Sequence, residues 1–259
     1  MPELKFTLVQ SDLKWENKKS NLEDFSEKIK PLAGKTEIVA LPEMFNTGFS
    51  MHAKDLSEPM DGESVEWMRQ TAKENRIILT GSLMIRDGEQ HFNRLIWMQP
   101  DGQMGFYDKR HLFSYAKENE AFQAGENKLV VSVKGWKIRP VICYDLRFPV
   151  WCRQQPNEPY DVLLVVANWP ESRIVAWKTL LQARAIENQC YVVAVNRVGE
   201  DGNQLFYNGA SCVVNPEGKF LYLGENKEDV FNIVLRRDEL NQVRDTFPFL
   251  KDGDDFTIF

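Results

Sequence analysis

Several features are missing from this chain, and each absence excludes a class of protein. No apolar run approaches the ~20 residues that a membrane-spanning helix needs. The N-terminus has no basic segment followed by a long apolar core, so it does not resemble a secretory signal. With 32 Lys and Arg against 38 Asp and Glu, the chain lacks the basic excess that nucleic-acid-binding proteins carry. We therefore expect a cytoplasmic protein that binds neither membranes nor nucleic acids.

Cysteine and histidine are also too few and too scattered to indicate a disulfide-stabilised protein or a metal-binding one. The 4 cysteines contain no C-x-x-C pair, and a disulfide framework is not expected in a cytoplasmic chain of 259 residues. None of the 3 histidines has metal-ligand spacing with another. A linker rich in Pro, Gly or Ser is absent as well, so we expect one domain over residues 1–259.

What the chain does contain is an alternation of short apolar strands and amphipathic helices. The predicted strands occupy residues 4–10, 37–43, 127–133, 136–145, 161–170, 190–199, 209–216, 218–224 and 229–236, with several more within 76–111. The predicted helices occupy residues 17–32, 63–75 and 173–189, with another after residue 145. Both halves hold strand–helix units, and the strands outnumber those of one doubly wound sheet. The pattern therefore predicts an α/β or α+β protein with two packed layers.

Three predicted strands end in a residue that can take part in acyl transfer. The segment "EIVALPE" ends at Glu43, "MGFYDK" at Lys109 and "RPVIC" at Cys143. Ligand sites of open α/β sheets lie beyond the carboxyl ends of strands, so the three side chains could meet in one crevice. Taken singly, each has an ordinary alternative: a solvated loop acid, a surface lysine and a buried small hydrophobe.

The chemistry of a thiol favours the combination. Cysteine has a free pKa of about 8.5; a neighbouring ammonium favours its thiolate, and a carboxylate can accept its proton. No histidine follows Cys143, so a Cys-then-His order is excluded, and His52 and His111 could serve only in an unusual arrangement. We therefore predict a Glu–Lys–Cys site formed by Glu43, Lys109 and Cys143.

The residues around these positions resemble the nitrilase superfamily of carbon–nitrogen hydrolases. Its signatures match in order as "ALPEMFNTGF", "YDKRHLF" and "VICYDLRFP", and the resemblance continues through "ANWP" and "WKTLLQARAIENQCYV" to "GASCVVNPEGK". It implies an α/β fold of the four-layer type, in which α-β-β-α sandwiches stack as homodimers or larger homo-oligomers. It also implies that a C-terminal tail, about residues 245–259, contacts a partner subunit.

The resemblance assigns a role to each predicted catalytic residue. Cys143 would attack the carbon of a small-molecule amide, and Glu43 would move the protons. Lys109 and the backbone N–H of Tyr144 would stabilise the oxyanion, and one such donor is worth on the order of 3 kcal/mol. No metal or organic cofactor is implied.

The superfamily often adds a second glutamate between the lysine and the cysteine. The segment "FSYAKENEAFQAG" offers Glu118 and Glu120. The spacing to Gly125 favours Glu118, although the loop is shorter than in many relatives.

Within the superfamily, "PEMFNTGF", "CYDLRFPVW" and "ANWP" are most similar to bacterial omega-amidases and the related Nit-type enzymes. The substrates implied are 2-oxoglutaramate and 2-oxosuccinamate, whose far carboxylate needs a cation. The candidates are Arg147, Arg173 and Arg197. Alternatively, Arg147 forms a structural ion pair with Asp145 or Glu187.

Aromatic residues beside the signatures are candidates for the walls of the pocket. Phe45 and Trp169 are predicted to wall it, with a place in the core as the alternative for Trp169. Tyr144 is expected to act through its backbone rather than its ring.

Three other functions compete with this hypothesis. The first is another activity of the superfamily: an N-carbamoyl hydrolase, an aliphatic amidase or a nitrilase. The second is an inactive binding protein on the same fold, and the third is a cysteine–histidine acyltransferase. The last predicts that His111→Ala is as damaging as Glu43→Gln.

Overall fold

The computed structural model describes residues 3–258, and their strands form two mixed sheets. The six-stranded sheet has the order β13-β1-β2-β3-β4-β5. Its strands are β1 Leu4–Gln10, β2 Ile38–Ala40, β3 Ile78–Asp87, β4 Gln90–Met98, β5 Met104–Asp108 and β13 Asp229–Leu235. The first and last strands of the chain thus pair within one sheet.

The seven-stranded sheet has the order β10-β11-β9-β8-β7-β6, with β12 also paired to β11. Its strands are β6 Val131–Val133, β7 Trp136–Ile142, β8 Val162–Val166, β9 Tyr191–Val195, β10 Val198–Glu200, β11 Phe206–Val214 and β12 Phe220–Glu225.

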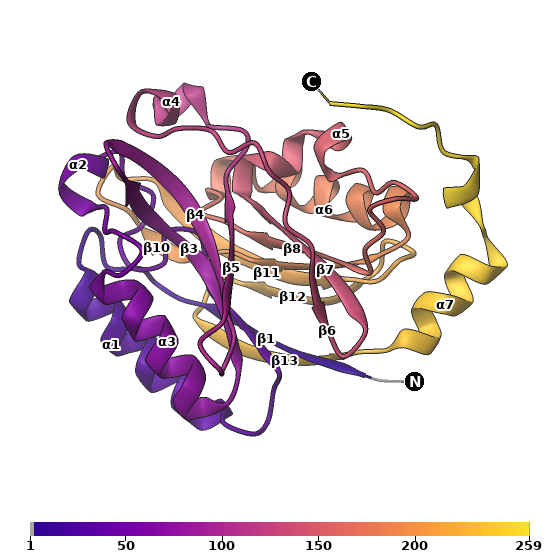
Figure 1. The fold of residues 1–259 in the computed structure, drawn as a ribbon, viewed down its shortest axis with the longest axis horizontal. Helices are drawn as coiled ribbons and strands as arrows, with labels where there is room; N and C mark the ends of the chain where they lie inside the picture. Colours follow the sequence, from indigo (N-terminus) through magenta and orange to yellow (C-terminus); the bar gives the residue numbers. More distant parts are fainter. Residues whose placement is uncertain (1–2, 259) are drawn as a thin grey trace.

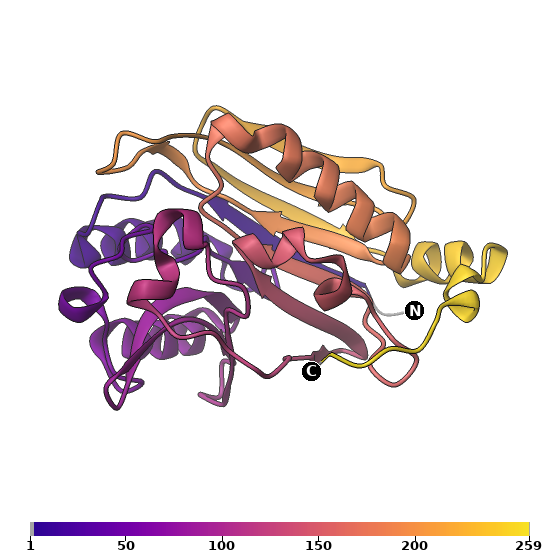
Figure 2. The same cartoon turned by 90° about the horizontal axis from the view of Figure 1, so that it is seen from above.

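Helices cover the outer faces of the two packed sheets, which gives the predicted α-β-β-α sandwich (Figures 1 and 2). The α-helices are α1 Lys18–Ile29, α2 Ala53–Leu56, α3 Glu63–Asn75, α4 Glu118–Ala121, α5 Pro149–Cys152, α6 Ile174–Asn188 and α7 Arg237–Thr246. Short 3-10 helices span η1 Lys30–Leu32, η2 Ser114–Ala116, η3 Cys143–Arg147, η4 Glu171–Arg173 and η5 Phe249–Asp252. None of the helices within residues 3–258 is long and apolar enough to cross a membrane.

Alternation along the strands divides the core between the two faces of each sheet. On β1, Phe6 and Leu8 join the large apolar cluster shared with the second sheet, whereas Val9 joins the cluster under α1 and α3. The buried positions of α1, among them Leu22 and Phe25, recur at helical spacing and face that second cluster. The six-stranded sheet therefore lies between two apolar cores.

Each sheet contains three consecutive parallel strands, which are β1-β2-β3 in the first and β7-β8-β9 in the second. Parallel strands present their carboxyl ends at the same edge. The segments that follow β2, β7 and β8 carry Glu43, Cys143 and Asn168, respectively.

The C-terminal region contains a helix, α7, which the sequence analysis missed. The helix leads into a tail that turns back along the sandwich, where the carbonyl of Phe256 accepts from Gln155 Nε2 at 3.1 Å (Figure 2). Only Leu240 of α7 is buried, so its apolar pattern is weak. Arg244 holds the helix to the body through Asp161, at 2.9 Å, and the carbonyl of Tyr160, at 2.7 Å.

Candidate active site

The turn after β2 carries Glu43 into the interior. It reverses at Met44, whose φ of 42° lies in the left-handed region. Ser82 of β3 holds the turn, because its Oγ accepts from the Met44 N–H at 2.8 Å and its carbonyl accepts from the Phe45 N–H at 3.1 Å. The side chain of Glu43 is fully buried as a result.

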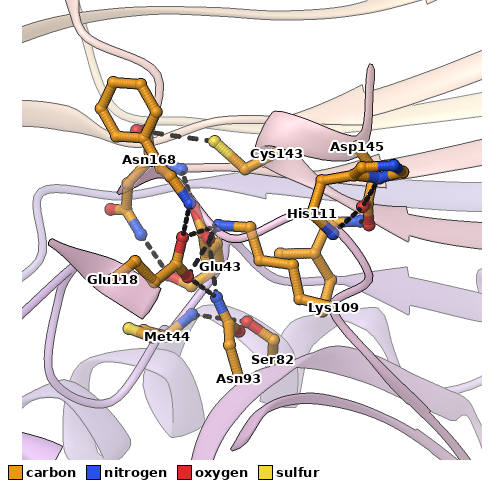
Figure 3. Close-up of polar contacts among 12 residues, drawn as sticks. Glu43, Met44, Ser82, Asn93, Lys109, His111, Glu118, Cys143, Asp145 and Asn168 are labelled. Atoms are coloured by element: carbon orange, nitrogen blue, oxygen red, sulfur yellow. Dashed lines mark hydrogen bonds and ion pairs between the residues drawn. The ribbon is translucent and has the colours of Figure 1, made fainter. Parts of the chain in front are cut away.

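Lys109 follows β5 and meets both carboxylates of the site (Figure 3). Its backbone is fixed on both sides, since its N–H donates to the carbonyl of Asn93 at 3.0 Å and its carbonyl accepts from Gly125 at 2.9 Å. Its Nζ lies 2.8 Å from Glu43 Oε1 and 2.9 Å from each carboxylate oxygen of Glu118. An ammonium therefore bridges two buried carboxylates.

The choice between Glu118 and Glu120 is clear from their positions. Glu118 opens α4 and is fully buried; it accepts from the Phe113 N–H at 2.6 Å and from Asn93 Nδ2 at 3.2 Å. Glu120 is exposed and lies 3.9 Å from Lys117 Nζ. Of the two glutamates, Glu118 is the one that contacts Lys109.

Cys143 occupies a strained position between β7 and η3. Its φ of 43° is in the left-handed region, which few residues with a Cβ adopt. Asp145 holds the turn: its carboxylate accepts from the Ile142 N–H at 3.1 Å, the Tyr107 hydroxyl at 2.6 Å and the His111 N–H at 2.9 Å. The same carboxylate thus ties the turn at Cys143 to the segment that carries Lys109.

The thiol of Cys143 faces an open space, unlike those of the other three cysteines, which are buried. Its Sγ lies 3.9 Å from the carbonyl of Asn168 (Figure 3). Tyr144 is the second residue of η3, and no carbonyl within that helix can accept from its N–H. A backbone donor therefore stands directly beside the sulfur in the sequence.

Electrostatics keeps the thiol neutral and the amine charged at rest. Although the sulfur borders the cavity, the protein around it removes most of its water, and this desolvation and the charge of Glu43 raise the pKa of the Cys143 thiol well above its usual value. The charge of Lys109 offsets this increase only in part. Burial alone would lower the pKa of Lys109, but the carboxylates of Glu118 and Glu43 outweigh it and raise that pKa. Burial likewise raises the pKa of the Glu118 carboxyl, against the opposing charge of Lys109.

A cavity of about 500 Å³ adjoins these groups. We call Glu43, Lys109, Glu118 and Cys143 the floor of this cavity, and Phe113, Tyr115, Arg147 and Arg173 its outer wall. Lys109 and Cys143 of the floor and all four residues of the outer wall line the open space. Asn168 and Trp169 line it as well.

Both predicted arginines of the outer wall face the cavity. The guanidinium of Arg147 lies 4.9 Å from the Trp169 ring, and that of Arg173 lies 5.1 Å from the Phe113 ring. Neither forms a salt bridge with a carboxylate of residues 3–258. The alternative in which Arg147 pairs with Asp145 or Glu187 is therefore wrong.

Arg197 was the third candidate for the substrate carboxylate, and the structure excludes it. Its side chain is fully buried, 3.3 Å from Asp12 Oδ1 and 3.0 Å from the carbonyl of Leu13. It joins the start of the chain to the segment after β9 and does not line the cavity.

Phe45 was predicted to wall the pocket, and the structure places it elsewhere. The left-handed turn at Met44 sends the Phe45 ring to the opposite face of the sheet, where it packs on Phe25 at 5.6 Å and on Trp67 at 5.7 Å. Trp169, by contrast, is both wall and core, because it lines the cavity and also lies 5.3 Å from Trp177.

Tyr144 and two residues without an assigned role complete the site. The Tyr144 ring lines the cavity and packs on Phe113 at 4.9 Å. Asn168 donates its N–H to Glu43 Oε2 at 2.8 Å, and Asn93 donates its Nδ2 to Glu43 Oε1 at 2.8 Å. The sequence analysis singled out neither residue: Asn168 lies within "ANWP", which could have indicated it, but one asparagine in a strand gave no signal for Asn93.

Comparison with known families identifies the family of this chain. The sequence model described as carbon-nitrogen hydrolase matches residues 5–245. The chain belongs to this family. It is therefore a hydrolase that acts on carbon–nitrogen bonds, on the nitrilase-superfamily sandwich that the sequence predicted.

Relatives of known name match this hydrolase over all or nearly all of its length. It is 40% identical over 260 residues to the omega-amidase YafV of Escherichia coli (strain K12), with 100% of both chains covered. It is 32% identical to the 2-oxoglutaramate amidase of Bacillus subtilis (strain 168), over 96% of this chain and 98% of that one.

Solved structures agree with the fold. The crystal structure of XC1258 from Xanthomonas campestris, a CN-hydrolase superfamily protein with an arsenic adduct in its active site, superposes with a TM-score of 0.98 at 44% identity and covers 100% of both chains. Nit3 of Saccharomyces cerevisiae, from branch 10 of the nitrilase superfamily, gives a TM-score of 0.86 at 25% identity, over 95% of this chain and 94% of that one.

Proposed function

We propose that this protein is an omega-amidase, which hydrolyses the terminal amide of a small omega-amido-2-oxo acid to the oxo-diacid and ammonia. One observation carries the proposal: a thiol and an ammonium line the cavity, a carboxylate lies 2.8 Å from that ammonium, and two guanidiniums without carboxylate partners line the outer wall. The floor suits amide hydrolysis, and the outer wall suits an anionic far end. The names of the relatives from E. coli and B. subtilis support the same activity.

In the first half of the reaction, Cys143 attacks the amide carbon while its proton moves to Glu43. The raised thiol pKa means that this transfer accompanies attack rather than precedes it. Lys109 Nζ and the Tyr144 N–H stabilise the negative charge that develops on the carbonyl oxygen. Glu43 then gives its proton to the departing nitrogen, so that ammonia leaves and a thioester remains.

In the second half, water replaces ammonia and the same carboxylate acts again. Glu43 takes a proton from water, whose oxygen attacks the thioester carbon, and the proton returns to the sulfur of Cys143. One water is consumed, one carboxylic acid is released, and the enzyme is restored. Glu118 keeps Lys109 charged throughout by adding a second carboxylate to its surroundings.

The test is ammonia release from three compounds by the purified protein: 2-oxoglutaramate, glutamine and a nitrile. We expect the highest kcat/KM for 2-oxoglutaramate, because its far end is an anion that either arginine can bind. Turnover of the nitrile without turnover of the amides would overturn the proposal. Preference for an N-carbamoyl or an aliphatic amide would move the protein to another activity of the family.

We also propose that the protein is cytoplasmic and that it forms a homo-oligomer. The four cysteines are free, which suits a reducing compartment. In the tail, Phe247 and Phe249 are 48% and 62% exposed, which supports contact with a partner subunit. Light scattering on the protein and on Phe247→Ser/Phe249→Ser tests this: we expect a dimer that the double substitution weakens, and a wild-type monomer would contradict it.

A further inference from the structure

Asn93 lies behind the floor, where it links the two carboxylates that Lys109 also bridges. It sits on β4 with no exposed surface. Its Nδ2 donates to Glu43 Oε1 at 2.8 Å and to Glu118 Oε1 at 3.2 Å (Figure 3). The two N–H bonds of a single amide thus hold two carboxylates from distant segments.

The amide is oriented at a cost. Its Oδ1 is buried and has no hydrogen-bond partner among the described residues. A flipped amide would point this oxygen at both carboxylates, so their charges decide the orientation. A buried acceptor without a partner is unfavourable, and its persistence here indicates that the two donors on the other side matter more.

Counting donors shows what Asn93 does to Glu43. Oε1 accepts from both Asn93 Nδ2 and Lys109 Nζ, which fills its two lone pairs. Oε2 accepts from the Asn168 N–H alone, so one lone pair remains. Oε2 is therefore the oxygen that can take the thiol proton of Cys143.

We propose that Asn93 is a positioning residue for catalysis: it occupies Glu43 Oε1, leaves Oε2 open toward Cys143, and holds Glu118 in place against the same lysine. This role rests on the proposed function, since it acts through the base of that reaction. The titratable groups that face Glu43 are Lys109 after β5, Glu118 of α4 and Cys143 of η3. Removing the donors of Asn93 leaves the two carboxylates with only Lys109 between them.

The test compares Asn93→Leu, which removes both donors, with Asn93→Asp, which keeps the shape and adds a third carboxyl group. We expect kcat to fall about tenfold to hundredfold with KM changed less than about threefold, because the base is misplaced while the outer wall is intact. The acid limb of the kcat/KM profile should move to higher pH, further for Asp than for Leu, since the ionised carboxylate loses a donor or gains a like charge.

A matched control is Asn188→Leu, at the end of α6. Asn188 is also fully buried, but its hydrogen bonds go to Gln154, Arg184 and Glu187, which lie outside the floor. We expect this variant to lower the melting temperature without moving the acid limb. The proposal is overturned if the Asn93 variants lose stability as this control does and keep the wild-type pH profile.

A second readout does not depend on the substrate. Cys143 is the one cysteine of the four that is not buried, so iodoacetamide should modify it selectively. Relative to the wild type, the acid limb of its alkylation rate should move to higher pH in both Asn93 variants and should stay in place in Asn188→Leu. If the wild type releases no ammonia, the proposed function fails, and the alkylation profile still decides the role of Asn93.

Discussion

The floor and the outer wall of the cavity differ in whether their charged side chains are paired with other charged side chains. On the floor, Lys109 is fully buried and paired with two carboxylates at 2.8 and 2.9 Å. In the outer wall, Arg147 and Arg173 contact aromatic rings and leave their charges open to the cavity. A closed network fixes the geometry of a reaction, whereas open charges are free for a ligand. In the proposed function, the groups that perform the chemistry are therefore separate from those that select the substrate.

The largest effect that should separate the two parts is loss of the nucleophile. Cys143→Ala should lower kcat by a factor on the order of 10⁶, as removal of a covalent nucleophile does elsewhere, while the protein stays folded. Ammonia release and a thermal melt measure the two properties. Cys212→Ala is the control, because Cys212 is fully buried on β11 and should affect stability alone. Turnover retained by Cys143→Ala would remove this residue from the mechanism.

The next effect tests which group on the floor is the base. Glu43→Gln should lower kcat by about 10³ to 10⁴, because general acid–base catalysis is lost in both halves of the reaction. His111→Ala should cost about tenfold or less, since His111 contacts Asp145 and Phe148 but does not line the cavity. Equal losses in the two variants would favour a cysteine–histidine acyltransferase instead.

The outer wall should respond in KM rather than in kcat. Replacing Arg147 or Arg173 by glutamine removes a charged donor worth about 1.5–3 kcal/mol, so KM for 2-oxoglutaramate should rise roughly tenfold to hundredfold. The variant with the larger rise identifies the arginine that holds the carboxylate. A neutral amide of the same length serves as the control substrate, and its KM should change little. A fall in kcat alone would assign that arginine to the floor.

Three of the four floor residues could be predicted from the sequence because each follows a strand, whereas Glu118 opens α4 and was predicted only from the resemblance to the family. Glu43 and Cys143 leave the parallel strands β2 and β7, whose carboxyl ends define one edge of each sheet, and Lys109 follows β5. Local spacing was enough for α6 as well, predicted over 173–189 and found at Ile174–Asn188. These features depend on short-range pattern and on the general behaviour of α/β sheets.

The errors arose where a side chain's direction depends on distant parts of the chain. Phe45 is two residues from Glu43, but the left-handed turn at Met44 sends its ring to the helix side of the sheet. Arg197 follows a strand like a site residue, yet Asp12, from the other end of the chain, holds it in the core. Neither a backbone reversal nor a long-range partner leaves a mark in the local pattern.

The smallest predicted effect is a change in the pKa of the Cys143 thiol when a carboxylate of the floor is removed. Desolvation is the largest cause of the raised pKa of the Cys143 thiol, and the charge of Glu43 is the second. The charge of Glu118 contributes less. Glu43→Gln removes a negative charge that disfavours the thiolate, so the pKa of Cys143 should fall, and Glu118→Gln should lower it less. Both shifts can be measured from the ultraviolet absorbance of the thiolate as the pH is raised. The same variants with Cys143→Ala added give the background absorbance to subtract. An unchanged or higher thiol pKa in Glu43→Gln would mean that burial alone keeps the sulfur protonated, and the floor would then owe its resting state to enclosure rather than to its carboxylates.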